Sequence, residues 1–246
     1  MTSLVVPARF RGPARSGNGG WSAGLLAAHL AAHLAAHRAA AAGGPAVTVR
    51  LRRPPPLDVA MEVGEQDGWW VATDDGAVVL QARAADTEPF PVAAVGADEA
   101  RAAEAAYAGL GSHPFPTCFT CGTGREPGDG LRIFPGPVGE GRVAATWTPH
   151  DSVGEDGLAT VPVTWAALDC AGAWAAGVDE RPMVLGSITA RLAGRPVVGE
   201  EHVVVGEARG QDGRKVATAT TVRGADGRVV GTAEAVWVLV DPDRFN

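Results

Sequence analysis

Apolar residues are distributed in two different ways along this chain. In residues 20–42 and 161–177 they are frequent and include many alanines, which predicts two helices. After each of these segments, apolar and polar residues alternate, as in half-buried strands, and Asp-Gly pairs separate the alternating runs. A helix needs a sheet on which to bury its apolar side. The pattern therefore predicts an α+β fold in which an antiparallel sheet wraps each long helix.

The order of elements is the same in the two halves of the chain. A basic and proline-rich stretch leads into a strand, a Gln-Asp-Gly turn, a second strand, another Asp-Gly turn and a third strand, over residues 52–84 and again over 194–235. This correspondence predicts a tandem duplication, although Asp-Gly is common enough for shared turns to arise by chance. The matching turns are Gln66-Asp67-Gly68 with Gln211-Asp212-Gly213, and Asp74-Asp75-Gly76 with Ala225-Asp226-Gly227.

Residues 85–150 separate the two halves and are rich in proline and glycine. They include a short predicted helix at 97–109, and each half is expected to open with further strand structure. These opening strands are predicted at 2–10, at 131–134 and at 142–148. The predicted units are a first one at 1–96, a linker with the short helix and a CxxC turn at 97–128, and a second one at 129–246.

Composition narrows the class of protein. The 246 residues, of which 46% are hydrophobic, suffice for one large globular unit or two smaller ones. The net charge is −7 and no run of Lys and Arg is dense, so neither nucleic acid nor a membrane is expected as a partner. The start of the chain lacks the pattern of a signal peptide, and an odd number of cysteines, three, fits a reducing compartment. We therefore expect a cytoplasmic protein.

One carboxylate, Asp169, lies in the middle of the apolar segment 161–178. Aspartate is a poor residue for a helix interior, and a charged side chain is rarely buried without a partner or a function. Two interpretations stay open: a functional carboxylate, and a structural one that is satisfied in the core or lies near a helix cap.

Two motifs resemble those of hotdog-fold acyl-CoA thioesterases. Ser16-Gly17-Asn18-Gly19-Gly20-Trp21 resembles the His-Gly-Gly or Phe-Gly-Gly opening of the hotdog helix, and Trp165-Ala166-Ala167-Leu168-Asp169-Cys170-Ala171 resembles the Leu-Ala-Asp-Thr-Ala stretch of PaaI-type thioesterases. The resemblance covers most of the chain outside 85–125 and implies a double hotdog, two tandem units that each wrap a sheet around a long helix. It implies hydrolysis of an acyl-CoA or acyl-carrier thioester without a cofactor. Exposed sheet edges would favour a homo-oligomer.

The two halves depart from the family pattern in complementary ways. In the family, the acid follows the glycine pair by seven or eight residues, but here Ala27 stands seven residues after Gly20, and no glycine pair precedes Asp169 at that distance. In dimeric members, the glycine end of one helix shares a site with the carboxylate of the partner helix. The resemblance therefore implies one composite site, Gly19 and Gly20 with Asp169, and a mirror site that has been lost.

The resemblance also gives each residue of that site a role. Backbone N–H groups of Gly19 and Gly20, at a helix N-terminus, would stabilise the oxyanion that forms on the thioester. Asp169 would act as general base or as nucleophile, and Asn18 would orient the water or bind the carbonyl. Substrate contacts are predicted for Trp21, Thr164, Trp165 and Arg53, with core packing as the default alternative for the tryptophans, and no metal is expected.

The cysteines form a second candidate motif. Cys118-Phe119-Thr120-Cys121-Gly122 has the spacing of half a zinc site. A complete site would also need His113 and Cys170, for which the sequence gives no geometry. Buried thiols in a tight, glycine-ended turn are the simpler interpretation.

Histidines and arginines are open to two interpretations as well. His29, His33 and His37 share one face of the first helix and could bind metal or sense pH, but a polar stripe on an alanine-rich helix is the simpler account. Several arginines near strand ends could meet the phosphates of a CoA-type carrier, or be solvated. They are Arg50, Arg52, Arg53, Arg191 and Arg195.

Two functions from different classes therefore stay open. The first is an acyl-thioester hydrolase with one composite site. The second is a catalytically silent hotdog protein that binds an acyl ligand or serves as a scaffold, because decay would also remove the acid from one helix and the glycines from the other. A dehydratase comes third, since the paired Asp and His of that group are missing. Asp169 within hydrogen-bond reach of the cleft beside Gly20 would favour the hydrolase.

Overall fold

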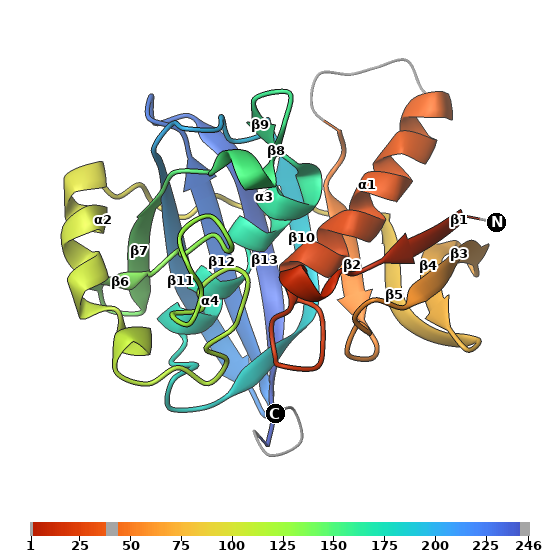
Figure 1. Cartoon of the computed structure of the whole chain (residues 1–246), viewed down its shortest axis with the longest axis horizontal. Coiled ribbons are helices and arrows are strands. Elements are labelled where there is room, and N and C mark those ends of the chain that lie inside the picture. Colours follow the sequence, from red (N-terminus) through yellow and green to blue (C-terminus); the bar gives the residue numbers. More distant parts are fainter. Residues whose placement is uncertain (1, 38–43, 242–246) are drawn as a thin grey trace.

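The computed structural model describes residues 2–37 and 44–241. In these ranges, one antiparallel sheet of eleven strands has the order β1-β3-β4-β5-β2-β10-β13-β12-β11-β7-β6 (Figure 1). Its strands are β1 (Thr2–Val5), β2 (Val47–Leu51), β3 (Ala60–Gln66), β4 (Trp69–Asp74), β5 (Ala77–Ala84), β6 (Gly136–Gly139), β7 (Arg142–Trp147), β10 (Met183–Leu192), β11 (His202–Asp212), β12 (Lys215–Arg223) and β13 (Val229–Leu239). A separate hairpin joins β8 (Gly154–Glu155) and β9 (Leu158–Ala159), and the helices are α1 (Gly19–His37), α2 (Ala97–Ala103), α3 (Val161–Ala167) and α4 (Cys170–Ala175).

The two halves of the sheet have the same strand order, reversed about the centre. From one edge inward, the strands of the first half are the first, third, fourth, fifth and second in chain order. From the other edge inward, β7, β11, β12, β13 and β10 give that order again, with β6 added outside. The inner strands β2 and β10 pair antiparallel, and the hydroxyls of Thr48 and Thr189 lie 2.8 Å apart across this junction.

Two glycines allow α1 to pack closely on α3 over the sheet (Figure 1). A Cβ atom at Gly20 would lie 2.6 Å from the carbonyl oxygen of Trp165, and a Cβ at Gly24 would lie 2.7 Å from the Cβ of Trp165. Real Cβ atoms do not approach other atoms so closely, so larger residues would push the helices apart. The glycines four residues apart therefore set the distance between the two helices.

The segment before β6 covers the other face of the second half. Side chains alternate along β11: Val204 belongs to the main core under the helices, whereas Val203 and Val205 belong to a second buried cluster. That cluster also contains Val92 and Ala100, from the segment that leads into α2 and from α2 itself. The part predicted as a linker is thus packed against the sheet rather than extended from it.

The single helix predicted over 161–177 is wrong, because the segment breaks into α3 and α4 at Leu168 and Asp169. In an uninterrupted helix, the carbonyl of Ala166 would accept the N–H of Cys170. Here it accepts the N–H of Asp169, at 3.1 Å, and the hydroxyl of Thr120, at 3.0 Å. Asp169 therefore stands in the break, with φ −87° and ψ −82°, immediately before α4.

Other predicted elements need smaller corrections. Residues 131–134 are not a strand, because the backbone of Leu131 and Ile133 donates to Phe119 and Thr120 in the neighbouring loop. The helix predicted at 97–109 ends at Ala103 and continues as short 3₁₀ turns. α1 is helical through His37, and the predicted remainder, 38–42, falls outside the described residues. Among the described residues, none of the helices has the length and hydropathy needed to cross a membrane.

Candidate functional site

The N-terminus of α1 is capped by Asn18. Its side-chain oxygen accepts the backbone N–H of Trp21 at 2.8 Å, which is the standard N-cap bond. The backbone N–H of Asn18 donates to the carbonyl of Phe10 at 2.7 Å. The cap leaves the side-chain amide of Asn18 pointing across to the break between α3 and α4. Asn18 thus starts one helix and contacts the beginning of another.

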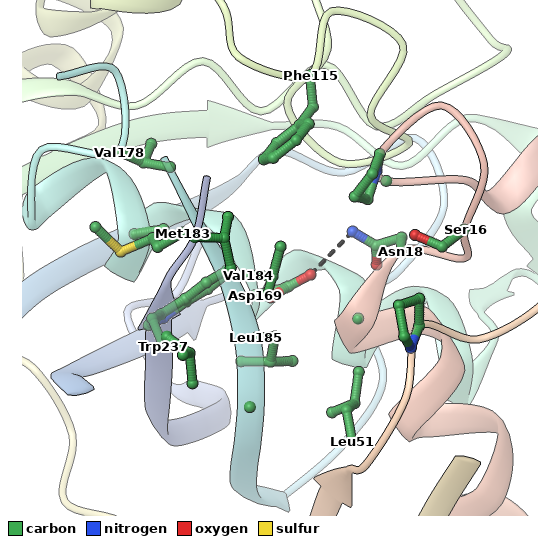
Figure 2. A pocket seen from close by; sticks show the side chains of 18 of the residues that line it. Ser16, Asn18, Leu51, Phe115, Asp169, Val178, Met183, Val184, Leu185 and Trp237 are labelled. Atoms are coloured by element: carbon green, nitrogen blue, oxygen red, sulfur yellow. Dashed lines mark hydrogen bonds between the residues drawn. The ribbon is translucent and has the colours of Figure 1, made fainter. Parts of the chain in front are cut away.

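The carboxylate of Asp169 lies against this helix N-terminus (Figure 2). Its Oδ2 atom accepts the Nδ2–H of Asn18 and the backbone N–H of Gly20, both at 2.9 Å. No acidic residue occupies the first turn of α1 itself, so the carboxylate from the other half of the chain supplies the negative charge that a helix N-terminus favours.

Gly20 and Gly19 make different contacts. A Cβ at Gly20 would lie 2.6 Å from the Cβ of Asp169, so the absence of a side chain is what allows its amide to reach the carboxylate. At Gly19, a Cβ would lie 2.8 Å from the Cβ of Leu185 on β10. The N–H of Gly19 has no hydrogen-bond acceptor among the described residues, so it is the donor at this helix end that a ligand can use.

Burial dominates the electrostatics of Asp169. The residue is 2% exposed, and its Oδ1 atom has no hydrogen-bond partner among the described residues. Loss of hydration raises the pKa of Asp169 to about 7, against the bonds from Gly20 and Asn18, which lower it. An unpartnered, buried carboxylate oxygen is costly in a purely structural role.

A cavity of about 850 Å³ opens beside this carboxylate. Asn18, Gly19 and Asp169 lie at its polar part, and exposed Arg52 and Arg53 also line it. Apolar side chains from the loop before β6, from the segment after α4, and from β10 and β13 form much of the remaining wall (Figure 2). They are Phe115, Val178, Met183, Val184, Leu185 and Trp237.

The structure brings together only part of the set predicted from the sequence. Asp169, Asn18, Gly19 and Gly20 meet at one point, and Arg53 lines the same cavity. Trp21, Thr164 and Trp165 do not line it. Trp21 stacks on Phe10, the Thr164 hydroxyl donates to the Thr160 carbonyl, and Trp165 packs against Gly24. These three residues are buried in the core, which fits packing, the default alternative for the tryptophans, better than contact with a ligand in this cavity.

The apolar wall of the cavity was missed by the sequence reasoning. Phe115, Met183 and Trp237 come from three separate segments, and nothing local marks them as neighbours. The alternation along 183–192 and 229–239 predicts buried faces, but it does not distinguish a face that packs on a helix from one that faces a cavity.

Most of the histidines and arginines singled out earlier have structural partners. His29 and His33 lie against the ring of Trp70, while the side chain of His37 is outside the described residues. Arg191 pairs with Glu88 at 2.9 Å, and Arg50 lies over the ring of Trp69. Polar stripes and strand-end contacts therefore account for these residues.

Comparison with known proteins gives a match at the level of fold. No family model and no curated protein matches the sequence. A putative thioesterase from Novosphingobium aromaticivorans superposes with a TM-score of 0.60 at 14% identity, covering 97% of this chain and 95% of that one. A hot dog fold protein of unknown function from Alicyclobacillus acidocaldarius gives 0.57 at 13% identity, covering 98% and 92%.

A third similar structure is the tesB protein of Mycobacterium avium subspecies paratuberculosis, with a TM-score of 0.54 at 17% identity, covering 93% of this chain and 89% of that one. All three similarities extend over nearly the whole length of both chains, although the sequences have diverged far. Together with the helices packed on one face of an antiparallel sheet, they show that this chain has the hotdog fold.

Proposed function

We propose that this protein hydrolyses acyl thioesters at the single site where α1 meets the break between α3 and α4. The observation that carries the proposal is the position of Asp169: its Oδ2 is held by the N-terminus of α1, and the residue lines an apolar cavity of about 850 Å³. Asp169 is among the residues that line the cavity beside Gly20, and a carboxylate that reaches this cleft favours a hydrolase over a silent binding protein.

In this proposal the two glycines have separate tasks. The N–H of Gly20 is engaged by Asp169, so it orients the carboxylate and is not the oxyanion donor that was expected. The N–H of Gly19 is left to donate to the carbonyl oxygen of the thioester, where the positive end of the α1 dipole stabilises the developing oxyanion. Asp169 then acts as general base: its unpartnered Oδ1 takes a proton from the attacking water. Asn18 positions Oδ2 through a bond of 2.9 Å.

We further propose that the site is composite because the chain is a tandem duplication of one hotdog unit. The mirrored strand order supports this, since the two halves repeat a non-sequential order that independent folds would rarely share. The first half provides the glycine end of a helix and the second half provides the acid. The mirror site has no carboxylate, because the buried Ala27 stands at the counted position on α1.

The cavity suits a substrate with an apolar acyl group and an anionic carrier. Phe115, Met183 and Trp237 would surround the acyl group, whereas exposed Arg52 and Arg53 on the same cavity would meet carrier phosphates. The similarity in fold to a putative thioesterase and a tesB protein is in keeping with such a substrate.

The test is release of free thiol from a panel of acyl thioesters, each carried both by CoA and by a phosphopantetheinylated carrier protein, comparing the native protein with Asp169→Asn. Asparagine keeps the volume of aspartate but cannot act as a base. We expect turnover of at least one thioester and a loss of at least about a hundredfold in kcat/KM in the variant. Equal activity of both proteins would show that hydrolysis does not depend on Asp169.

A second function, ligand binding without hydrolysis, is favoured by one observation: Asp169 is only 2% exposed. Calorimetry with the same panel separates the two. Binding of an acyl-CoA by a native protein that releases no thiol would establish the silent form.

A further inference from the structure

The three cysteines, which the proposed hydrolysis does not use, come together beside Asp169. Cys118 and Cys121 belong to the loop before β6, and Cys170 is the first residue of α4. Their three sulfur atoms lie within 4.8 Å of one another, and all three residues are buried. Segments 49 residues apart in sequence thus converge on one point, which the CxxC spacing alone did not predict.

The spacing of the sulfur atoms matches that of a metal–thiolate site. A tetrahedral Zn²⁺ with Zn–S bonds of about 2.3 Å places its sulfur ligands about 3.8 Å apart. The Sγ atoms of Cys118 and Cys170 are 3.7 Å apart. A disulfide would need these atoms at about 2.0 Å. The distance between Cys118 and Cys170 therefore fits two thiolates on one cation, and the sulfur of Cys121 lies within 4.8 Å of both.

The sulfur of Cys118 has a nitrogen donor beside it, since Asn18 Nδ2 donates to it at 3.7 Å. The turn needs its glycine, because a Cβ at Gly122 would lie 2.5 Å from the carbonyl oxygen of Cys118. Hydrogen bonds to sulfur are the supporting contacts that thiolate ligands of a metal receive.

His113, the fourth ligand expected for a zinc site at this place, does not complete the set. Its Nδ1 accepts the N–H of Phe115 at 2.9 Å, and its Nε2 lies 3.1 Å from the carbonyl oxygen of Cys121. Both ring nitrogens are therefore engaged. The three cysteines all line the cavity that the substrate would enter.

We propose that Cys118, Cys121 and Cys170 bind one Zn²⁺ ion through three thiolates, with a fourth position open to the cavity. Three sulfur ligands select soft or borderline cations such as Zn²⁺ over Mg²⁺ or Ca²⁺. Binding exchanges three S–H bonds for three S–Zn bonds and releases three protons to solvent, which leaves a single net negative charge near the Nδ2–H donor of Asn18. The ion would fasten the loop that carries Cys118 to the helix break that carries Asp169.

The test uses metal content and spectroscopy, so it does not depend on hydrolysis. The full chain, expressed in zinc-supplemented medium and purified without chelator, should contain about one zinc per chain by elemental analysis. After removal of the zinc, one Co²⁺ per chain should bind with the charge-transfer absorption of cobalt–thiolate bonds. Zn²⁺ should displace the Co²⁺, because zinc binds such sites more tightly.

Variants separate the proposed ligands from their surroundings. Cys118→Ser, Cys121→Ser and Cys170→Ser should each weaken Co²⁺ binding at least tenfold and reduce the charge-transfer absorption. This factor is a lower bound, because losing a mere supporting partner already costs about 10–100-fold. Thr123→Ala, in the same loop, is the matched control and should bind as the native chain does. His113→Ala should also retain the absorption, because its ring is not a ligand.

Three results would overturn the proposal. A native chain that purifies metal-free with three reduced thiols, and that binds no Co²⁺, would make the cysteines simple core residues. A Cys118–Cys170 disulfide found by peptide mapping would make the cluster a redox pair. Loss of the cobalt absorption in His113→Ala, in a protein that keeps its native circular dichroism, would make the site a closed one with four protein ligands.

Discussion

The two helices that face each other at the centre of this protein begin differently. α1 has glycines at its start, an asparagine cap and no acid, and it continues as one helix through His37. Its counterpart in the second half starts without glycines and is broken at the acid into α3 and α4. The first helix has the glycines and the second segment has the acid, and they meet where Gly20 and Asn18 donate hydrogen bonds to Asp169.

This difference teaches that the environment of Asp169 is shared between the two halves. The break between α3 and α4 places the carboxylate at the end of α1, and the missing side chain at Gly20 lets that helix come close enough to bind it. Substitutions on either side of this contact test the dependence.

An acid placed on α1 at the position where the family pattern has one should not create a second site. Ala27 is 3% exposed and belongs to the main hydrophobic core. Ala27→Asp should therefore lower the free energy of unfolding by about 3 kcal/mol or more, because it buries an unpaired charge. Urea denaturation measures this. Ala31→Asp, at an exposed position of the same helix, is the control and should change stability by no more than about 0.5 kcal/mol.

A side chain at Gly20 should push α1 away from the helix break that carries Asp169. The added methyl group of Gly20→Ala would lie 2.6 Å from both Asp169 Cβ and the Trp165 carbonyl oxygen. We expect overpacking to lower the free energy of unfolding by about 1–3 kcal/mol and to reduce thioesterase activity. Thermal unfolding measures the first effect and thiol release measures the second. Gly64→Ala, where a Cβ meets nothing within 4 Å, should do neither. If both variants behaved alike, close packing at Gly20 would not be needed.

Asn18 allows the cap to be separated from the contact with Asp169. Asn18→Ala removes both the cap and the bond to Asp169. It should lower the free energy of unfolding by about 1 kcal/mol and also reduce activity. Asn18→Ser keeps an oxygen that can accept the N–H of Trp21 but has no amide to donate to Asp169. It should be nearly as stable as the native protein and still lose about tenfold in kcat. A fully active serine variant would show that Asn18 serves the helix alone.

The smallest effect is expected at the cavity arginines. Arg53→Ala should raise KM for a CoA thioester a few-fold at low ionic strength and leave kcat unchanged, since an exposed charge contributes little to binding. The same substitution should have less effect in high salt. Arg195→Ala, which lies outside the cavity lining, serves as the control.

Much of the fold could be predicted because local patterns carry it. Alternation and Asp-Gly turns predicted the strands that became β3, β4 and β5 and β11, β12 and β13, and the alanine-rich run predicted α1. A position near a helix cap was one of the interpretations left open for Asp169, and it stands at the N-cap of α4. A single helix was nevertheless predicted, because the sequence does not show that the hydroxyl of Thr120 donates to the carbonyl of Ala166, 46 residues away. The expected strand at 131–134 failed for a similar reason, since its backbone bonds go to a loop.

The site divides in the same way. Asp169 could be picked out because a carboxylate is unusual in an apolar segment, and Asn18 and the glycines because their motif resembles the opening of the hotdog helix. Sequence does not distinguish a helix residue that faces a cavity from one that faces the core, and Trp21, Thr164 and Trp165 point into the core. The wall formed by Met183 and Trp237 and the grouping of Cys170 with Cys118 arise only from tertiary packing.

The most direct test of the composite site is a crystal structure of the Asp169→Asn variant with an acyl-CoA that the native protein hydrolyses. We predict the thioester carbonyl oxygen about 3 Å from the backbone nitrogen of Gly19, the side chain at position 169 beside the thioester carbon, and the acyl group among Phe115, Met183 and Trp237. A carbonyl bound away from Gly19, or a ligand outside this cavity, would contradict the account.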